Sequence, residues 1–413
     1  MGLILTADIG SSSLKAALID PDGRLKAIGR AVYDQKPPCA EDWERAFTIT
    51  LKALNSQAPD CQIVAVCFSG NGPTLVPVTS DGKSLPPVYW NKTKATASVQ
   101  AERPSLFLPH VSWFKNTAQN EYEQTALFIS SHEWLAYRLG GEAFTVLPQA
   151  SYEPYYWDDE QCRFFDLDKT KFPPFIKTGS VMGYVSAKAA AYFSSYYKIK
   201  SGTPIIAGGP DFITALIGTN TLRPGELCDR AGSSEGINFC SSAPNNSKDL
   251  RSLPHAIQGL WNLGIIIPAS GKLFEQYRIN SGQENRPYKE LLEELIPDHY
   301  IQNGAFPDSQ SEKILQGRTV LCDMAKAVRN ALETLKSHGF HLSEMRVSGG
   351  QGKNPRWNQL KADITGISLL MPEIPDGELA GNAVIAAASL KEACSIEEAA
   401  SKMIRFREVF TPK

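Results

Sequence analysis

The sequence predicts an α/β protein of two domains. Three observations carry this prediction: strand-like apolar runs alternate with helical patterns, glycine-rich turns follow several of the strands, and one hairpin design occurs once in each half. At 413 residues the chain is long enough for two domains that each bury a core. We expect one domain at residues 1–220 and the other at residues 221–413.

The composition is that of an ordinary globular protein, with 42% hydrophobic and 21% charged residues and a net charge of −2. A near-neutral balance without a long Lys/Arg block argues against a nucleic-acid partner. The N-terminus lacks the pattern of a signal peptide, and no apolar run is long enough to cross a membrane. The eight cysteines are scattered without CxxC pairs, which indicates reduced core thiols. We therefore expect a cytoplasmic protein without a membrane partner.

The first hairpin lies at the N-terminus, where an apolar run reaches Asp8 and a second apolar run continues through Lys15. Between the two runs lies a tip of four small residues, Gly10, Ser11, Ser12 and Ser13. Backbone N–H groups and hydroxyls at such a tip can surround a phosphate, and Asp8 is placed to hold Mg²⁺ through water. Taken alone, an ordinary Gly/Ser turn explains the same pattern.

The elements that follow are typical of an α/β domain. Helical spacing of apolar residues predicts a helix over 41–56, and the apolar run 63–68 predicts a strand. This strand ends in Ser69-Gly70-Asn71-Gly72-Pro73-Thr74, and segments past a strand's carboxyl end commonly face the ligand crevice of an open sheet. Residues 75–78 and 87–90 flank a turn, as in a hairpin.

Ser130 and Glu133 form the pattern of a capping box for a helix that runs through Leu139 and is closed by Gly140. Residues 144–175, rich in aromatics and proline, indicate an irregular insertion. A strand at 204–209 is then followed by Asp211 and an apolar helix to residue 218. Asp211 either caps this helix or is a base projected into a cleft.

The second hairpin spans residues 225–240, with Gly232, Ser233 and Ser234 at its tip. A fold with one phosphate-binding hairpin in each half would produce this duplication. Gly/Ser turns are also common enough to produce it by chance. There is no GxxxxGK[ST] or GxGxxG pattern, so neither a P-loop nor a Rossmann fingerprint supports nucleotide binding.

The last third of the chain alternates again between strands and helices. We expect a strand at 261–267, a helix from 271, a polar surface excursion at 282–312 and an amphipathic helix at 323–336. A strand from Met345 then ends in a turn that contains Gly349, Gly350 and Asn354, and Pro355 begins the next helix. The glycines of this turn allow a flat base or a phosphate to approach closely. A strand at 369–371 and a helix from Glu378 complete the pattern.

Together these segments resemble the FGGY family of carbohydrate kinases, a branch of the actin/Hsp70/sugar-kinase superfamily, and the xylulokinase-like members in particular. The resemblance covers nearly the whole chain in the correct order. The matching segments are Asp8-Ile9-Gly10-Ser11-Ser12-Ser13-Leu14-Lys15 (first phosphate loop), Gly208-Gly209-Pro210-Asp211 (G-G-x-D), Ala231-Gly232-Ser233-Ser234 (second phosphate loop), Ser348–Trp357 with Ala362-Asp363 (adenosine segment), and Glu378–Ala383 (E-x-x-G-A-A).

This resemblance implies two ribonuclease H-like (actin-like ATPase) domains around a nucleotide cleft. It implies ATP and Mg²⁺ as cofactors, with the metal near Asp8 and with Asp211 as the catalytic base. The residues implied to hold the nucleotide are Gly10, Ser11, Ser12, Ser13, Lys15, Gly232, Ser233, Gly349, Gly350 and Asn354. Lys15 either neutralises phosphate charge or is a solvated strand residue.

The chain departs from the family pattern on the acceptor side. Xylulokinase-like members carry S-G-Q-M-H-G at residues 69–74 and W-N-D-x-R at residues 90–94, where this chain has Lys92 in place of the Asp. Lys92 and Lys94 either favour an anionic acceptor or are simply solvated. The residues expected to contact the acceptor are Asn71, Gly72, Pro73, Trp90, Asn91 and Asp211.

We therefore expect ATP-dependent phosphorylation of a hydroxyl on a sugar, a sugar acid or a polyol. A non-catalytic nucleotide-binding or sugar-sensing protein on the same fold is the alternative, motivated by the altered acceptor segments. An actin-like filament former fits the G-G-x-D and adenosine segments less well. The sequence names neither the acceptor nor its hydroxyl, and it is compatible with a homodimer.

Overall fold

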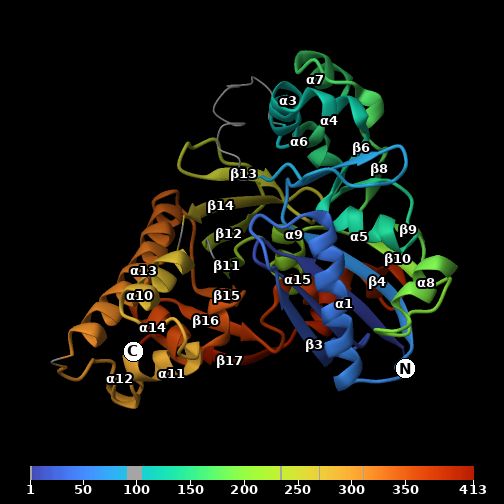
Figure 1. Ribbon diagram of the computed structural model, residues 1–413. Coiled ribbons are helices and arrows are strands. Elements are labelled where there is room, and N and C mark those ends of the chain that lie inside the picture. The colour runs from blue at the N-terminus through green and yellow to red at the C-terminus, as the bar shows by residue number, and fades with distance from the viewer. Residues whose placement is uncertain (1, 91–104, 233–234, 269, 310) are drawn as a thin grey trace. The chain divides into compact units, whose positions relative to one another are not determined.

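The computed structural model describes residues 2–90, 105–232, 235–268, 270–309 and 311–413. The chain forms two compact units, each built on a mixed β-sheet (Figure 1). The first unit comprises Met1–Gly218 with Glu378–Met403, and the second comprises Thr219–Gly377 with Ile404–Lys413. The predicted α/β class is confirmed.

The division of the chain differs from the expected boundary in one respect. The expected second domain ran from 221 to 413, whereas α15 (Gly377–Ser389) and α16 (Ile396–Met403) pack with the first unit. Gly381 makes this packing close, because a Cβ atom there would lie 1.8 Å from the carbonyl oxygen of Thr214 in α9 (Asp211–Gly218). Two helices late in the sequence thus complete the first unit.

The sheet of the first unit has the strand order β3-β2-β1-β4-β10-β9. Its strands are β1 (Leu3–Ile9), β2 (Ser13–Ile19), β3 (Leu25–Val32), β4 (Ile63–Gly70), β9 (Val181–Tyr184) and β10 (Pro204–Pro210). Strand β4 is parallel to both β1 and β10. The carboxyl ends of these three strands therefore meet at one edge of the sheet, where ligand sites of α/β folds commonly lie.

One face of this sheet packs on α1 (Ala40–Gln57), whose Trp43, Phe47 and Leu51 are fully buried in the core. Helix α5 (Ser131–Leu139) contacts β4 and β10 and begins with the predicted capping box of Ser130 and Glu133. It ends at Gly140 in the left-handed conformation, as predicted. The short helix α8 (Ala187–Phe193) packs beside α5.

Residues 105–178 add a peripheral layer of short elements to the first unit. These are α3 (Leu108–Thr117), α4 (Gln119–Gln124), β6 (Thr125–Ser130), β7 (Thr145–Leu147), η1 (Ala150–Tyr152), α6 (Glu153–Tyr156), α7 (Asp159–Phe164), η2 (Lys169–Lys171) and β8 (Phe175–Lys177). The expected hairpin of 75–78 with 87–90 is present only as irregular antiparallel pairing, in which Leu75 and Val88 exchange both backbone hydrogen bonds and Val78 bridges Ser84. The antiparallel partner strand of β5 (Leu75–Thr79) is β6.

The sheet of the second unit has the order β13-β14-β12-β11-β15-β16-β17. Its strands are β11 (Leu227–Ala231), β12 (Glu235–Ser241), β13 (Arg251–Pro254), β14 (Trp261–Ile267), β15 (Glu344–Ser348), β16 (Ser368–Pro372) and β17 (Phe406–Phe410). The predicted second hairpin is present as β11 and β12. Strand β11 is antiparallel to β12 and parallel to β15, which repeats the pairing of β1 with β2 and β4.

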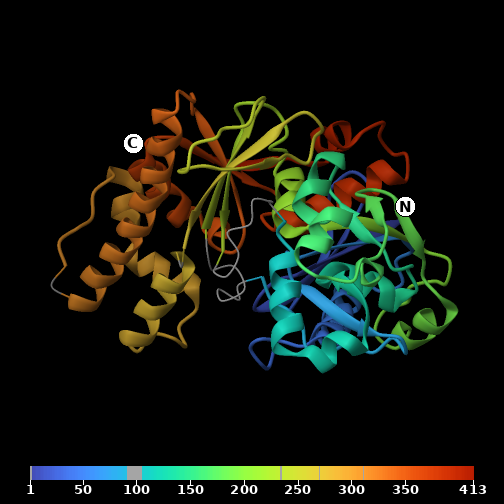
Figure 2. The ribbon, with the colours of Figure 1, turned by 90° about the horizontal axis from the view of Figure 1, so that it is seen from above.

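The long helix α13 (Glu312–Ser337) joins two cores of the second unit. Its C-terminal half, with Val328 and Leu332, packs on the sheet. Its N-terminal half packs against α10 (Ser270–Asn280), α11 (Tyr288–Leu295) and α14 (Pro355–Thr365), and Figure 2 shows the gold and orange helices gathered on one side of the yellow-green strands.

The expected surface excursion at 282–312 is wrong. This stretch forms α11 and α12 (Asp298–Asn303), and it buries Leu291, Leu295 and Tyr300 in the helical core. A few apolar side chains at helical spacing are enough to bury one face, even though the stretch as a whole is polar.

No helix in the described part of the chain is long and apolar enough to cross a membrane. All eight cysteines are free thiols. Cys67, Cys162, Cys228 and Cys240 are buried, and Cys394 is exposed.

Candidate functional site

The first hairpin closes in a tight turn between β1 and β2. The backbone N–H of Gly10 donates to the carbonyl oxygen of Ser13 across 3.1 Å, and Arg30 in β3 donates to the Ser13 hydroxyl across 3.0 Å. Ser11 is exposed at the tip and Ser12 is half-buried. The turn is therefore anchored at its base, while its tip presents hydroxyl and N–H groups outward.

Asp8 lies directly before this turn and is buried, opposite Lys15 in the strand register. The Ser69 hydroxyl at the end of β4 donates to Asp8 Oδ1 across 2.8 Å. Burial raises the pKa of Asp8 to about 7, as do the negative charges of Glu378 and Asp211, while Lys15 and Ser69 act to lower it. Three carboxyl groups thus interact electrostatically at one edge of this sheet.

This carboxyl group fits a hydrated Mg²⁺ ion better than a metal held wholly by protein. A buried carboxylate with acidic neighbours attracts a divalent cation, and Mg²⁺ usually keeps several waters while binding one or two carboxylates and substrate phosphates. Among the described residues, no group of three His, Cys, Asp or Glu side chains is arranged to hold a metal ion. The donor set is thus compatible with Mg²⁺ bound near Asp8 through water.

Asn382 in α15 is a site residue that the sequence analysis missed. Its buried carboxamide donates to the carbonyl oxygen of Ala7 across 3.1 Å and to the Ser69 hydroxyl across 2.9 Å. Because Ser69 in turn donates to Asp8, a chain of hydrogen bonds runs from α15 to the Asp8 carboxyl group. The available signal was a polar side chain within an otherwise apolar helical run.

Asp211 is the first residue of α9 and directly follows β10. Gly208 allows β10 to approach β4, because a Cβ atom there would lie 1.9 Å from the carbonyl oxygen of Phe68. The Thr178 hydroxyl donates to the carbonyl oxygen of Gly208 across 2.8 Å and holds the strand end. Asp211 therefore both begins a helix and lies close enough to Asp8 to influence its pKa.

The predicted acceptor segment follows β4. Asn71 donates to the Ser11 hydroxyl across 3.3 Å and accepts from the Ser131 hydroxyl across 3.4 Å, so it links the first loop to the start of α5. The next residue, Gly72, lies beside Pro210, and its peptide bond to Pro73 is cis. Trp90 is exposed. Asn91, Lys92 and Lys94 lie outside the described residues.

The second hairpin loop begins at Gly232, and Ser233 and Ser234 lie outside the described residues. The carbonyl oxygen of Gly232 accepts from Gln351 Nε2 across 2.8 Å. Gly271 in α10 lies against the same oxygen, because a Cβ atom there would be 2.4 Å from it.

In the turn after β15, two residues that were expected to hold adenosine, Gly349 and Asn354, have structural roles. Gly349 has φ +90°, and a Cβ atom there would lie 2.5 Å from the carbonyl oxygen of Ala231, so this position requires glycine. Among the described residues, a Cβ atom on Gly350 would meet nothing within 4 Å. Asn354 is the N-cap of α14, and its side-chain oxygen accepts from the Trp357 N–H across 3.1 Å.

The sequence analysis also missed a buried ionic cluster in the second unit. Lys361 Nζ lies 2.6 Å from Asp229 Oδ2 and 2.5 Å from Glu235 Oε1. The Ser270 hydroxyl donates to Glu235 Oε2 across 2.6 Å. The only feature of the sequence that could have indicated this cluster is the presence of three charged residues in segments expected to be buried.

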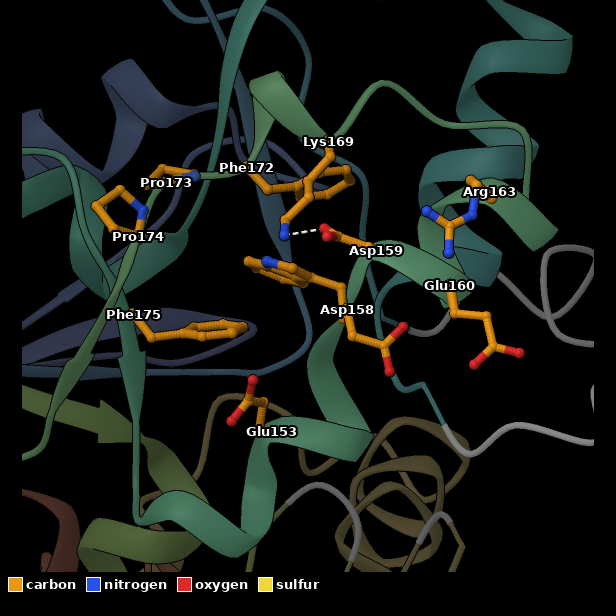
Figure 3. A pocket seen from close by; sticks show the side chains of 11 residues that line it. Glu153, Asp158, Asp159, Glu160, Arg163, Lys169, Phe172, Pro173, Pro174 and Phe175 are labelled. Carbon is orange, nitrogen blue, oxygen red and sulfur yellow. Dashed lines mark hydrogen bonds and ion pairs between the residues drawn. The ribbon is translucent and has the colours of Figure 1, made fainter.

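The peripheral layer of the first unit contains a cavity of about 700 Å³ (Figure 3). It combines acidic side chains with an aromatic wall, and an ion pair joins Lys169 and Asp159. The residues that line it are Glu153, Trp157, Asp158, Asp159, Glu160, Arg163, Lys169, Phe172, Pro173, Pro174 and Phe175. In the described part of the chain, none of the predicted site residues lines this cavity.

Two sheets of the same design, each with a small-residue hairpin loop, define an actin-like ATPase fold. The model of the FGGY family of carbohydrate kinases, N-terminal domain, matches residues 3–218, and the C-terminal domain model matches residues 305–390. The chain belongs to the FGGY family of carbohydrate kinases, and it is a sugar phosphotransferase. The residues that the C-terminal domain model matches belong to the second unit up to Gly377 and to the first unit from Glu378 onward.

Relatives and solved structures cover nearly the full length of this chain. The xylulose kinase of Bacillus subtilis (strain 168) is 23% identical in an alignment 481 positions long, gaps included, which covers 100% of this chain and 93% of that protein. The crystal structure of ligand-bound xylulose kinase from Lactobacillus acidophilus has a TM-score of 0.81 at 17% identity and covers 100% and 94% of the two chains. Plasmodium falciparum glycerol kinase with ADP has a TM-score of 0.77 at 17% identity, with the same coverage. These structures show that the fold is shared.

Proposed function

We propose that the protein transfers the γ-phosphoryl group of ATP to a hydroxyl of a small sugar, sugar acid or polyol. One observation in the first unit carries this proposal. The carboxyl ends of β1, β4 and β10 are in register, which brings Asp8, Asn71 and Asp211 to the same edge of the sheet. A phosphate loop, an acceptor segment and a carboxylate base are the parts that such a transfer requires.

Both small-residue hairpin loops are assigned to the phosphates in this proposal. Gly10–Ser13 on the first unit offers N–H and hydroxyl donors above an anchored base, and Lys15 adds a positive charge near Asp8. Gly232 and Ser233 on the second unit belong to a hairpin of the same design. Phosphoryl transfer depends mainly on positioning and on charge neutralisation, and both loops serve these ends.

Asp211 acts as the general base in this proposal. Its carboxylate accepts the proton of the acceptor hydroxyl while that oxygen forms its bond to the γ-phosphorus, and the bond between the γ-phosphorus and the bridging oxygen of ADP breaks. Asp8 would hold a magnesium ion through water, and the ion would supply positive charge to neutralise the phosphates. The chain of hydrogen bonds from Asn382 through Ser69 holds the Asp8 carboxyl group in a single orientation.

The acceptor and adenosine contacts complete the proposal. Asn71, Gly72, Pro73, Trp90 and Asn91 are assigned to the acceptor. Gly349, Gly350 and Asn354 are assigned to adenosine, and the space at Gly350, which the described residues leave open, supports a ligand there. The relatives named for xylulose and glycerol support a polyhydroxylated acceptor. A cytoplasmic location and a homodimer stay predictions.

A panel of sugars, sugar acids and polyols, assayed by ADP release from Mg-ATP, tests this function. We expect ADP release to depend on one acceptor class, because bound water is a poor substitute for a positioned hydroxyl. Nucleotide binding without any acceptor-dependent ADP release across the panel would contradict the proposal and favour a non-catalytic nucleotide-binding protein. A preference for sugar acids over neutral sugars would implicate Lys92 and Lys94.

A further inference from the structure

The ionic cluster of Asp229, Glu235 and Lys361 is one of the most completely buried features of the second unit. All three side chains are at most 1% exposed. Lys361 contacts both carboxyl groups, and Ser270 donates to the second oxygen of Glu235. Such a cluster contributes little net stability, because burying ionised groups costs much of what their attraction returns.

The surroundings of the two carboxyl groups shift their pKa values in opposite directions. Burial, and after it the negative charge of Glu235, raise the pKa of Asp229 to about 8, although the positive charge of Lys361 acts to lower it. Burial also acts to raise the pKa of Glu235, but Lys361 and Ser270 outweigh it, so this pKa lies below its usual value. The cluster thus favours the protonated form of Asp229 and the ionised form of Glu235, which is paired with the Lys361 ammonium group. Buried charges that are paired in this way persist without a large penalty.

The cluster lies at the base of the second hairpin loop. Glu235 is the first residue of β12 and pairs with Ala231, the last residue of β11, so these two residues flank the loop. Asp229 is in β11, Lys361 in α14, and Ser270 is the first residue of α10. The hydrogen bonds of the cluster thus join both strands of the hairpin to two helices.

Two further contacts hold the start of the same loop. Gln351 Nε2 donates to the carbonyl oxygen of Gly232, and Gly271 allows α10 to approach that oxygen. The described residues on the two sides of the loop, Gly232 and Glu235, are therefore both held by contacts with neighbouring elements. Apolar side chains of similar volume often replace a buried ion pair without loss of stability, so stability alone does not explain three charges at this place.

We propose that Glu235, Lys361, Asp229 and Ser270 are positioning residues that hold the two strand ends of the second hairpin, Ala231 and Glu235, where ATP binding through its β- and γ-phosphates requires them. This inference rests on the proposed function, because it assumes that the loop binds phosphate. The four side chains act on the nucleotide through the backbone on either side of the loop. Directed hydrogen bonds specify one backbone position, which apolar packing does less well.

Two variants of the full-length protein test the proposal. Ser270→Ala removes one donor to Glu235, and Glu235→Gln replaces the central carboxylate by an amide of the same shape. Calorimetric titration gives the dissociation constants of Mg-ATP and of AMP, which keeps the adenosine but lacks the β- and γ-phosphates. We expect ATP binding to weaken about tenfold in Glu235→Gln and roughly threefold in Ser270→Ala, with AMP binding unchanged.

Ser281→Ala is the matched control. Its buried hydroxyl donates to the carbonyl oxygen of Tyr277 across 2.7 Å in the same unit. Its other hydrogen-bond partners in the described part of the chain are Arg278, Gln283 and Lys313. Its melting temperature should fall while the ratio of ATP to AMP affinity stays at the wild-type value. If Glu235→Gln does not fold, the dissociation constants of Mg-ATP and AMP for the milder variant Ser270→Ala test the proposal.

Two outcomes would overturn the proposal in distinguishable ways. If both variants melt earlier but keep the wild-type ratio of ATP to AMP affinity, the cluster is only structural, and the proposed function stands. If the wild-type protein itself binds Mg-ATP no more tightly than AMP, the loop does not bind phosphate. In that case the proposed function fails together with this inference.

Discussion

Asp211 both begins a helix and lies near the carboxyl group of Asp8. It begins α9 directly after β10, and its charge influences the pKa of Asp8. The two interpretations of this residue from the sequence, helix start and base, are therefore compatible. Helix starts present their first side chains at the end of a sheet, which is where a base in an α/β fold is useful.

Replacement of Asp211 by Asn should separate binding from chemistry. We expect Asp211→Asn to lower acceptor-dependent kcat by about 10²–10⁴, because an amide cannot accept the hydroxyl proton. The dissociation constant for Mg-ATP should stay within about twofold of wild type, because the side-chain shape is kept. Asp22→Asn, an exposed carboxyl on the turn between β2 and β3, is the control and should leave both values unchanged. Wild-type turnover in Asp211→Asn would remove this residue from the mechanism.

At the scale of elements, the turn after β15 shows why two neighbouring glycines are not equivalent. Gly349 has a positive φ and lies against the carbonyl oxygen of Ala231, whereas Gly350 is helical with φ −63° and, within the described part of the chain, faces open space. The first glycine is required by the approach of β15 to β11. The second is free to serve a ligand.

Alanine at these two positions should therefore have opposite consequences. We expect Gly349→Ala to lower the free energy of unfolding by about 1–3 kcal/mol, because the backbone would be strained and the Cβ atom would collide with β11. Gly350→Ala should leave the free energy of unfolding unchanged or raise it by up to about 1 kcal/mol. Urea denaturation measures both values, and equal losses would contradict the different roles. A weaker affinity of Gly350→Ala for ATP would support an adenosine contact there.

Turns and caps were the elements best predicted from the sequence. Both hairpins, the capping box of Ser130 and Glu133, and the glycine cap at Gly140 depend on side chains a few residues apart. Helices α11 and α12 were missed because their apolar residues are few and lie in a polar stretch. The partner of β5 was missed because β6 follows after a long connection, and local turn signals favoured a nearer segment.

At the scale of the whole molecule, both units bury histidines that should make folding sensitive to acid, namely His110 and His132 in the first unit and His255 in the second. Burial lowers the pKa of His132 in the first unit to about 3 and that of His255 in the second to about 4. In the unfolded chain a histidine binds its proton below pH of about 6.5. Below that pH the unfolded state therefore binds more protons than the native state, and stability falls as the pH falls.

His255→Gln isolates this effect from the acidic groups, whose raised pKa values act in the opposite direction. As the pH falls from roughly 6 to 4, the wild-type protein should lose free energy of unfolding relative to His255→Gln, by about 1.4 kcal/mol per pH unit. Denaturant titrations across this range measure the shift. The exposed His341→Gln serves as control and should follow wild type at each pH. A difference that does not change with pH would show that His255 is protonated in the native state.

The sequence by itself determined the α/β class, both small-residue hairpins, the helix caps and the family, because these depend on local patterns of residues in a fixed order. Only the tertiary structure decided that α15 completes the first unit, that Asn382 reaches Asp8 through Ser69, and that Lys361 pairs with Asp229 and Glu235. These contacts join residues far apart in the chain. Which of many polar side chains meet in a core depends on how strands pair and helices pack, and the residues themselves carry no local sign of their partners.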